Sequence, residues 1–256
     1  MLLIELVAGV GGSPARGEAA CEIVALWRER ELVSLASVRP TVVLAHDFPA
    51  EAIECLLPFL TQLQAGLLKS GRPRGDELWQ RLAEAGRQSI VDRTESSYRL
   101  TLPVESVNPG ADGCAPHAVR LAEPADLEDL VFAARASLRE EKRPDPFDGD
   151  PSGFRRWVLS RVPRARVVEL DGRLRFVAYA DVRRPEGWLV QGVYTWPEAR
   201  RRGLARSGMA QLVSEAQEAG ADHIQLAVVD GNRAAIALYE QLGFEAFDSL
   251  RTVLFF

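Results

Sequence analysis

The chain has 256 residues, which leaves room for one large domain or two small ones, and its net charge is −5. This mildly acidic balance argues against a general nucleic-acid surface, and no apolar run approaches the roughly 20 residues of a membrane span. The opening residues carry no basic cluster and Glu5 interrupts their apolar run, so they make a poor signal peptide. The cysteines, Cys21, Cys55 and Cys114, lie far apart without metal-ligand spacing. Free thiols in a reducing cytoplasm fit this pattern best, and we expect no metal site.

Residues 1–102 form the first predicted domain, a small α/β domain. Its pattern predicts a glycine-rich turn over 9–17, strands over 41–45 and 97–102, and helices over 18–35, 49–63 and 77–85. The glycine-rich turn lacks the Lys-Ser/Thr pair of a phosphate loop, because Glu18 and Ala19 follow Gly17. The first domain therefore carries no chemical signature of its own.

A linker and a second domain follow. Residues 103–116 contain three prolines and two glycines, a composition typical of a linker. Asp171-Gly172 is the strongest short-range signal of a β-hairpin in this part of the chain. The predicted elements of the second domain are a strand over 118–121, helices over 123–138 and 152–162, hairpin strands over 166–170 and 173–181, a strand over 188–196, a helix over 204–220, a strand over 223–229, a helix over 232–243 and a strand over 244–256.

The turn between the strand over 188–196 and the following helix has the features of an anion site. Pro197 stops the strand, since proline cannot donate to a ladder. Small residues, Gly203 and Ala205, then lead into the helix, whose first N–H groups and macrodipole favour a negative charge. The neighbouring arginines add positive charge, so the expected ligand is a diphosphate. The alternative is an arginine-rich helix start that is merely solvated.

Two motifs on these elements resemble the GNAT superfamily of acyl-CoA-dependent N-acyltransferases. The family's Arg/Gln-x-x-Gly-x-Gly/Ala turn is matched by Arg200, Gly203 and Ala205. Its later helix motif is matched by Asn232, Ala235, Leu238, Tyr239, Gly243 and Phe244. The resemblance covers about residues 117–256, and it implies a mixed, mostly antiparallel α/β sheet flanked by helices. The Gln191-Gly192-Val193 strand and the Thr252-Val253-Leu254-Phe255 ending resemble one bacterial group of two-domain members, which implies that residues 1–102 are a diverged GNAT-like half.

The resemblance implies a binding site for acetyl-CoA as cosubstrate. Backbone groups of the strand pair with the pantetheine arm, backbone amides of the turn hold the pyrophosphate, and the start of the later helix lies near the arm. Gly192 is expected to mark a β-bulge that splays the strand from its neighbour over 224–229. The implied cofactor-binding residues are Val193, Tyr194, Thr195, Arg200, Arg201, Arg202, Gly203, Leu204, Ala205, Arg206 and Asn232.

The sequence offers one candidate for the general acid but no single clear candidate for the general base. By resemblance, Tyr239 is the general acid that protonates the CoA sulfur, whereas the alternative is a core tyrosine on an amphipathic helix. The strand over 188–193 carries no carboxylate and offers only Gln191, at the end of a water chain. Other candidate bases are Glu140, Glu141 and Asp181, of which Glu141 is the first choice, although a solvated helix-end glutamate remains the alternative.

The leading hypothesis is a cytoplasmic N-acetyltransferase that moves an acetyl group from acetyl-CoA to a primary amine in a direct ternary complex. The acceptor is a small molecule or a peptide, with no nucleic-acid or membrane partner, and the sequence leaves a homodimer open. One alternative is a regulatory module that senses acyl-CoA without turnover. Another is a glycine-type or longer-chain acyltransferase. Fold analogy alone does not identify the acceptor.

Overall fold

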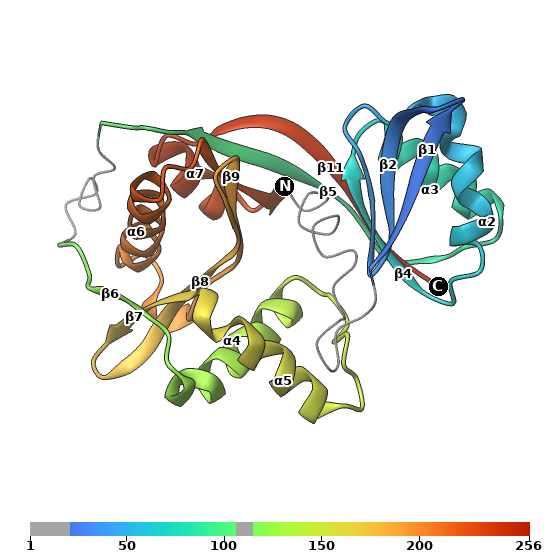
Figure 1. Ribbon diagram of the computed structural model, residues 1–256. Helices are drawn as coiled ribbons and strands as arrows, with labels where there is room; N and C mark the ends of the chain where they lie inside the picture. The colour runs from blue at the N-terminus through green and yellow to red at the C-terminus, as the bar shows by residue number, and fades with distance from the viewer. Residues whose placement is uncertain (1–20, 106–114) are drawn as a thin grey trace. The chain divides into compact units, whose positions relative to one another are not determined.

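The computed structural model describes residues 21–105 and 115–256 (Figure 1). The predicted glycine-rich turn over 9–17 and most of the predicted linker lie outside the described residues. The chain divides into two compact units. The first contains Met1–Ser97, Ala227–Asn232 and Ala246–Phe256, and the second contains Tyr98–Leu226 and Arg233–Glu245.

The first unit is a sheet covered by short helices. Its strands follow the order β1-β2-β3-β4-β11-β5, and only the first part of β5 belongs to this unit. The strands are β1 (Glu22–Arg28), β2 (Glu31–Arg39), β3 (Thr41–Leu44), β4 (Gly66–Gly71), β5 (Ser89–Thr101) and β11 (Glu245–Phe255). The helices are η1 (Ala50–Leu56), α2 (Leu57–Leu60) and α3 (Arg74–Glu84). Residues 246–256, which the sequence groups with the second domain, thus pack in the first unit.

The predicted helix over 18–35 is wrong from residue 22 onward, because β1 and β2 form an antiparallel hairpin there. Glu29, with a φ of 56°, turns the chain between them without the glycine that usually signals such a turn. The second strand is fixed by its partners, since Ala36 and Ser37 pair with both β1 and β3 and are fully buried. Strand pairing therefore overrides the local helical pattern here.

The second unit contains the last part of β5, the first part of β10 and the strands β9, β8, β7 and β6. Their order in the sheet is β5-β10-β9-β8-β7-β6. The pairs from β6 to β9 are antiparallel, and β9 and β10 are parallel. The predicted elements of this part are confirmed within a few residues. They are β6 (Val119–Leu121), η2 (Pro124–Asp126), α4 (Leu127–Glu140), α5 (Pro151–Arg161), η3 (Val162–Arg164), β7 (Ala165–Leu170), β8 (Arg173–Arg184), β9 (Gly187–Thr195), η4 (Pro197–Ala199), α6 (Leu204–Glu218), β10 (His223–Val229) and α7 (Arg233–Gln241).

Helices cover both faces of the part of the sheet that lies in the second unit (Figure 1). On one face, α4 and α5 pack against inward side chains of β8 such as Val177 and Tyr179. On the other face, α6 approaches so closely that a Cβ on Gly208 would lie 2.0 Å from Cε1 of Phe176. Glycine at this position thus allows the helix to rest directly on the buried ring.

Two β-bulges interrupt the pairing of β8 with β9. Val177 pairs with Tyr194 and Tyr179 with Gln191, which leaves Gly192 and Val193 opposite a single residue. Gly192 takes a φ of 59°, and the predicted bulge is confirmed. Parallel pairing with β10 is found only at Trp188 and Leu189, so beyond this point β9 runs without that neighbour. A splayed strand of this kind leaves backbone groups open to a ligand.

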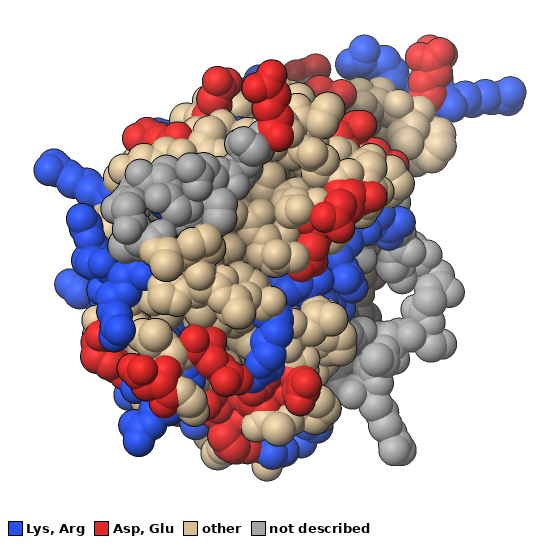
Figure 2. Space-filling view, turned by 90° about the vertical axis from the view of Figure 1, so that its left-hand side faces the viewer, with Lys and Arg blue, Asp and Glu red and all other residues tan. Residues whose placement is uncertain are grey.

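Charges are mixed on the side of the second unit shown in Figure 2. Lys and Arg side chains are interspersed there with Asp and Glu, and uncharged surface lies between them. Within the described residues, no helix is both long and apolar enough to cross a membrane.

Candidate acyl-CoA site

The end of β9 and the start of α6 form the predicted strand, turn and helix. The chain leaves β9 at Thr195, passes through η4, and adopts left-handed backbone at Arg201 (φ 62°) and Gly203 (φ 80°). Gly203 is the N-cap of α6, and no side chain in the described structure caps this terminus. A helix start that is led by glycine and has no side-chain cap suits an anion, because its first backbone N–H groups point out of the helix.

Arg200 links this turn to the end of α4. Its Nη2 donates to both carboxylate oxygens of Glu140, at 2.8 and 2.7 Å, and its Nε donates to Thr195 O at 3.0 Å. The hydroxyl of Tyr194 also donates to Glu140, at 3.1 Å. Burial and the Glu140 charge raise the pKa of Tyr194 to about 12, so its phenol stays protonated. We call these four residues the Glu140–Arg200 clamp; a direct contact between Arg200 and a phosphate stays a prediction.

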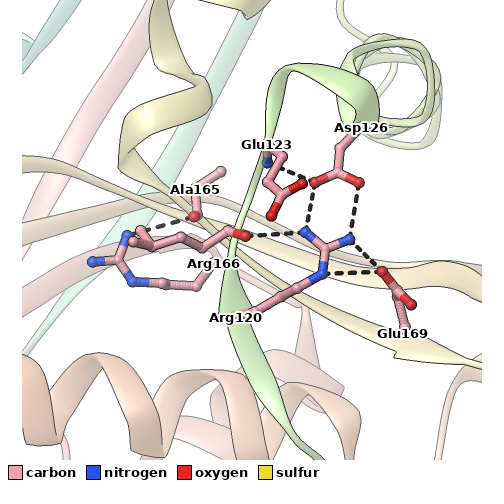
Figure 3. A network of polar contacts seen from close by, with 7 residues as sticks. Arg120, Glu123, Asp126, Ala165, Arg166 and Glu169 are labelled. Carbon is pink, nitrogen blue, oxygen red and sulfur yellow. Dashed lines mark hydrogen bonds and ion pairs between the residues drawn. The ribbon is translucent and has the colours of Figure 1, made fainter.

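The helix that carries Glu140 is also anchored at its other end (Figure 3). Arg120 of β6 donates to both oxygens of Asp126, at 2.7 and 2.9 Å, and to Glu169 of β7. Asp126 and Glu123 cap the start of the helical segment reciprocally. Hydrogen bonds from Arg120 lower the pKa of Asp126, so its carboxylate stays charged. Both ends of α4 are thus held against the sheet.

The other arginines of the turn differ in their surroundings. Arg201 and Arg202 are exposed, and the Arg202 carbonyl lies 2.8 Å from Nε2 of His117, which then carries the proton. Arg206 is only 2% exposed, and its Nη2 donates to Gln241 at the end of α7. Arg201 and Arg202 are therefore the cations best placed to meet a phosphate, while Arg206 joins two helices.

Tyr239 lies on α7 and is 5% exposed. Its ring centroid lies 6.4 Å from that of Tyr98 and 6.0 Å from that of Phe244. Burial raises the pKa of its phenol well above the ordinary value, so the group is protonated at neutral pH. A protonated phenol can give a proton to a thiolate, which is the predicted role.

The two glutamates at the end of α4 have different partners. Glu140 belongs to the clamp, where three donated hydrogen bonds occupy its carboxylate. Glu141, the predicted first choice for the base, is the C-cap of α4 and lies 3.8 Å from Nη1 of Arg143 at a partly exposed position. Glu140 is therefore committed to the clamp, and Glu141 stays the predicted base.

The remaining candidate bases lie beside the bulges. Gln191 is half-buried and directly opposite Tyr179. Asp181 accepts hydrogen bonds from Nε and Nη2 of Arg161, a residue that the sequence pattern does not single out. Both carboxylate oxygens of Asp181 are therefore engaged by Arg161.

Asn232 belongs to the first unit, where its N–H donates to Val229 O at 3.0 Å. Val193 and Thr195 lie on the splayed part of β9 and are half-buried. The second unit thus contains a helix start without a side-chain cap, a splayed strand and a buried tyrosine. This arrangement suits a ligand that has both a diphosphate and an extended arm.

Residues 128–244 match the model of the Acetyltransferase (GNAT) family, so this part of the chain resembles a GNAT domain. The predicted resemblance, the mixed α/β fold and the acyltransferase class are thereby confirmed. The family uses acetyl-CoA. No curated protein matches the chain in sequence.

Three solved structures are similar in fold. A GCN5-related N-acetyltransferase from Sphaerobacter thermophilus is 14% identical with a TM-score of 0.64, over 98% of this chain and 84% of that one. A GNAT-family acetyltransferase from Colwellia psychrerythraea is 14% identical with a TM-score of 0.54, over 92% and 86%. A tandem GNAT protein from the clavulanic acid biosynthesis pathway is 16% identical with a TM-score of 0.51, over 99% and 91%. The last fold fits the prediction of two domains.

Proposed function

We propose that the protein transfers the acetyl group of acetyl-CoA to a primary amine of a small molecule or a peptide. The observation that carries this proposal is the uncapped start of α6, led by the left-handed Gly203 and placed directly after the splayed end of β9. Backbone amides at a helix start bind phosphate, and an unpaired strand edge binds an extended chain. The cytoplasm is the compartment that we propose for the reaction.

Donor binding follows from these elements. The pyrophosphate occupies the backbone amides of residues 201–206, and the exposed side chains of Arg201 and Arg202 add charge. The pantetheine arm pairs with the backbone of Val193 and Thr195. The bulge at Gly192 turns a backbone N–H toward the thioester oxygen, which stabilises the negative charge that develops there.

The chemistry is direct attack in a ternary complex. The neutral amine nitrogen attacks the thioester carbon, the carbon–sulfur bond breaks, and Tyr239 gives a proton to the departing sulfur. The ammonium formed on the acceptor loses its proton to Glu141, or to water held by Gln191. Because a thiol has a pKa of about 8.5, its thiolate leaves tolerably well without help, and Tyr239 assists the step without being indispensable.

There are two alternatives, and the first has an observation in its favour. The engagement of Glu140 and Asp181 by arginines leaves few carboxylates for a base, which favours a module that binds acyl-CoA without turnover. A glycine-type or longer-chain acyltransferase would use the same donor site with a wider opening for the acyl group.

The test is amine-dependent release of thiol from acetyl-CoA. The protein is incubated with acetyl-CoA and a panel of primary amines, and free thiol and the mass of the acetylated product are measured. We expect thiol release that requires both protein and amine, with one acetyl group in the product per thiol. Binding of acetyl-CoA without any amine-dependent release would favour the sensing module instead.

A further inference from the structure

Arg161, the last residue of α5, is held rigidly inside the second unit. Its Nε and Nη2 donate to the two carboxylate oxygens of Asp181, at 3.2 and 2.5 Å. Its Cζ lies 4.0 Å from the ring centroid of Tyr179 and 4.8 Å from that of Trp157. The side chains of Arg161 and Asp181 are 13% and 11% exposed. Two rings and a carboxylate thus fix the plane of one guanidinium.

This guanidinium borders the bulge at which we place acyl transfer. A Cβ built on Gly192 would lie 2.9 Å from Cδ2 of Tyr179 and 3.6 Å from Nη2 of Arg161. Tyr179 pairs directly with Gln191, so the two side chains share the sheet face that α5 covers. The cation therefore lies on that face, next to the position where an acceptor would meet the thioester.

A second bulge directs Asp181 toward Arg161. Ala180 pairs with Val190 and Val182 with Leu189, so Asp181 is the extra residue of β8. Bulges of this kind re-aim a side chain and are frequent beside active sites. Asp181 orients Arg161 through Nε and Nη2, while Nη1 has no hydrogen-bond partner among the described residues.

Arginine with one unused N–H edge is suited to a carboxylate, because its planar donors match the two oxygens. Burial strengthens such a contact, and the stacked rings remove the entropy cost of ordering the side chain. If the ion pair of Arg161 and Asp181 served only to stabilise the fold, it would need neither an unpaired Nη1 nor a position beside the bulge at Gly192. Arg164, whose Nη1 lies 3.9 Å from Asp181, adds a further positive charge nearby.

We propose that Arg161 binds a carboxylate of the acceptor, so that the acceptors are amines that carry a carboxylate close to the amino group, such as free amino acids. This inference rests on the proposed function and names the substrate class of the same site. Asp181, Trp157 and Tyr179 are positioning residues that hold the guanidinium. The carboxylate of the acceptor contacts Nη1, which directs the amino group toward the thioester beside Gly192.

The test compares the common L-amino acids with their C-terminal amides as acceptors, by kcat/KM in the thiol-release assay. We expect the wild type to prefer the best acid over its amide by at least about tenfold, since the amide lacks the charge that strengthens the hydrogen bond to Arg161. The first variant is R161K, which keeps the positive charge but loses the planar set of guanidinium donors. The second is the double variant R161Q/D181N, which replaces the ion pair by neutral amides. Both should lose most of the preference, and the Kd for acetyl-CoA should not change.

The two proposals fail in different ways. Calorimetric titration with acetyl-CoA tests the donor site alone, and absence of binding by the wild type would contradict the proposed function. If acetyl-CoA binds but the acids are used no better than their amides, or are not used at all, the inference about Arg161 is overturned. It is also overturned if the double variant folds, binds acetyl-CoA and keeps the full preference.

Discussion

Replacing Glu140 by glutamine removes the charge at the centre of the Glu140–Arg200 clamp while it keeps the size of the side chain. The carboxylate receives two hydrogen bonds from Arg200 and one from Tyr194. The side chains of Arg200 and Glu140 are 43% and 45% exposed, so the pair contributes about 0.5–1 kcal/mol to the free energy of unfolding. If the same free energy orders the turn for acetyl-CoA, its loss raises the Kd for acetyl-CoA by about two- to fivefold.

The assay is calorimetric titration of the wild type and Glu140→Gln with acetyl-CoA, together with thermal unfolding of each. The matched control is Glu128→Gln on the same helix, which removes an exposed ion pair with Arg155 far from the turn. We expect the Kd to rise for Glu140→Gln and to stay constant for the control, with small changes in Tm for both. An unchanged Kd for Glu140→Gln would refute the view that the clamp positions the donor site.

Three further predictions follow from single contacts. Tyr239→Phe should lower kcat by about 10²-fold, with little change in the Kd for acetyl-CoA; an unchanged kcat in steady-state assays would place Tyr239 in the core only. Gly208→Ala should lower the free energy of unfolding by about 1–3 kcal/mol in denaturant titration, because its Cβ would meet Phe176; equal stability would contradict that close packing. Burial opposes ionisation of Glu95 and Glu215, but hydrogen bonds and charges from Lys69 and Arg166, respectively, lower their pKa values. The stability that they contribute is present above about pH 4.3 and lost as the pH falls further, so Tm should drop below about pH 4.3, and less steeply for Glu215→Gln.

Local signals account for the parts of the fold that could be predicted. The Asp171-Gly172 turn and the periodic apolar residues of α4, α6 and α7 are contiguous in sequence, and the structure places these elements as predicted. The hairpin of β1 and β2 could not be found this way. Its turn at Glu29 has no glycine or proline, and its burial depends on β3, which follows later in the chain. Such pairing is a tertiary effect that local propensity does not report.

The candidate site also has a part that local sequence predicts and a part that depends on contacts between distant residues. The turn from Arg200 to Ala205 is continuous, and its anion-binding geometry follows from the strand, the left-handed Gly203 and the helix start. The contacts that hold it are distant in sequence. Glu140 and Arg200 are 60 residues apart, and Arg161 and Asp181 are 20 apart on different elements. Only the assembled sheet shows that these charges are paired, and hence which carboxylates are left to act as a base.

The most direct test of the account is calorimetric titration with acetyl-CoA of the wild type, Gly203→Glu and Gly220→Glu. Both glycines have left-handed backbone, at φ 80° and 71°, and they flank opposite ends of α6, so the two variants carry equal charge and similar strain. We predict binding by the wild type with a Kd of about 1 µM, or about −8 kcal/mol. Gly203→Glu should abolish this binding, and Gly220→Glu should retain it. Equal binding by Gly203→Glu and the wild type, or no binding by the wild type, would contradict a pyrophosphate site at the start of α6.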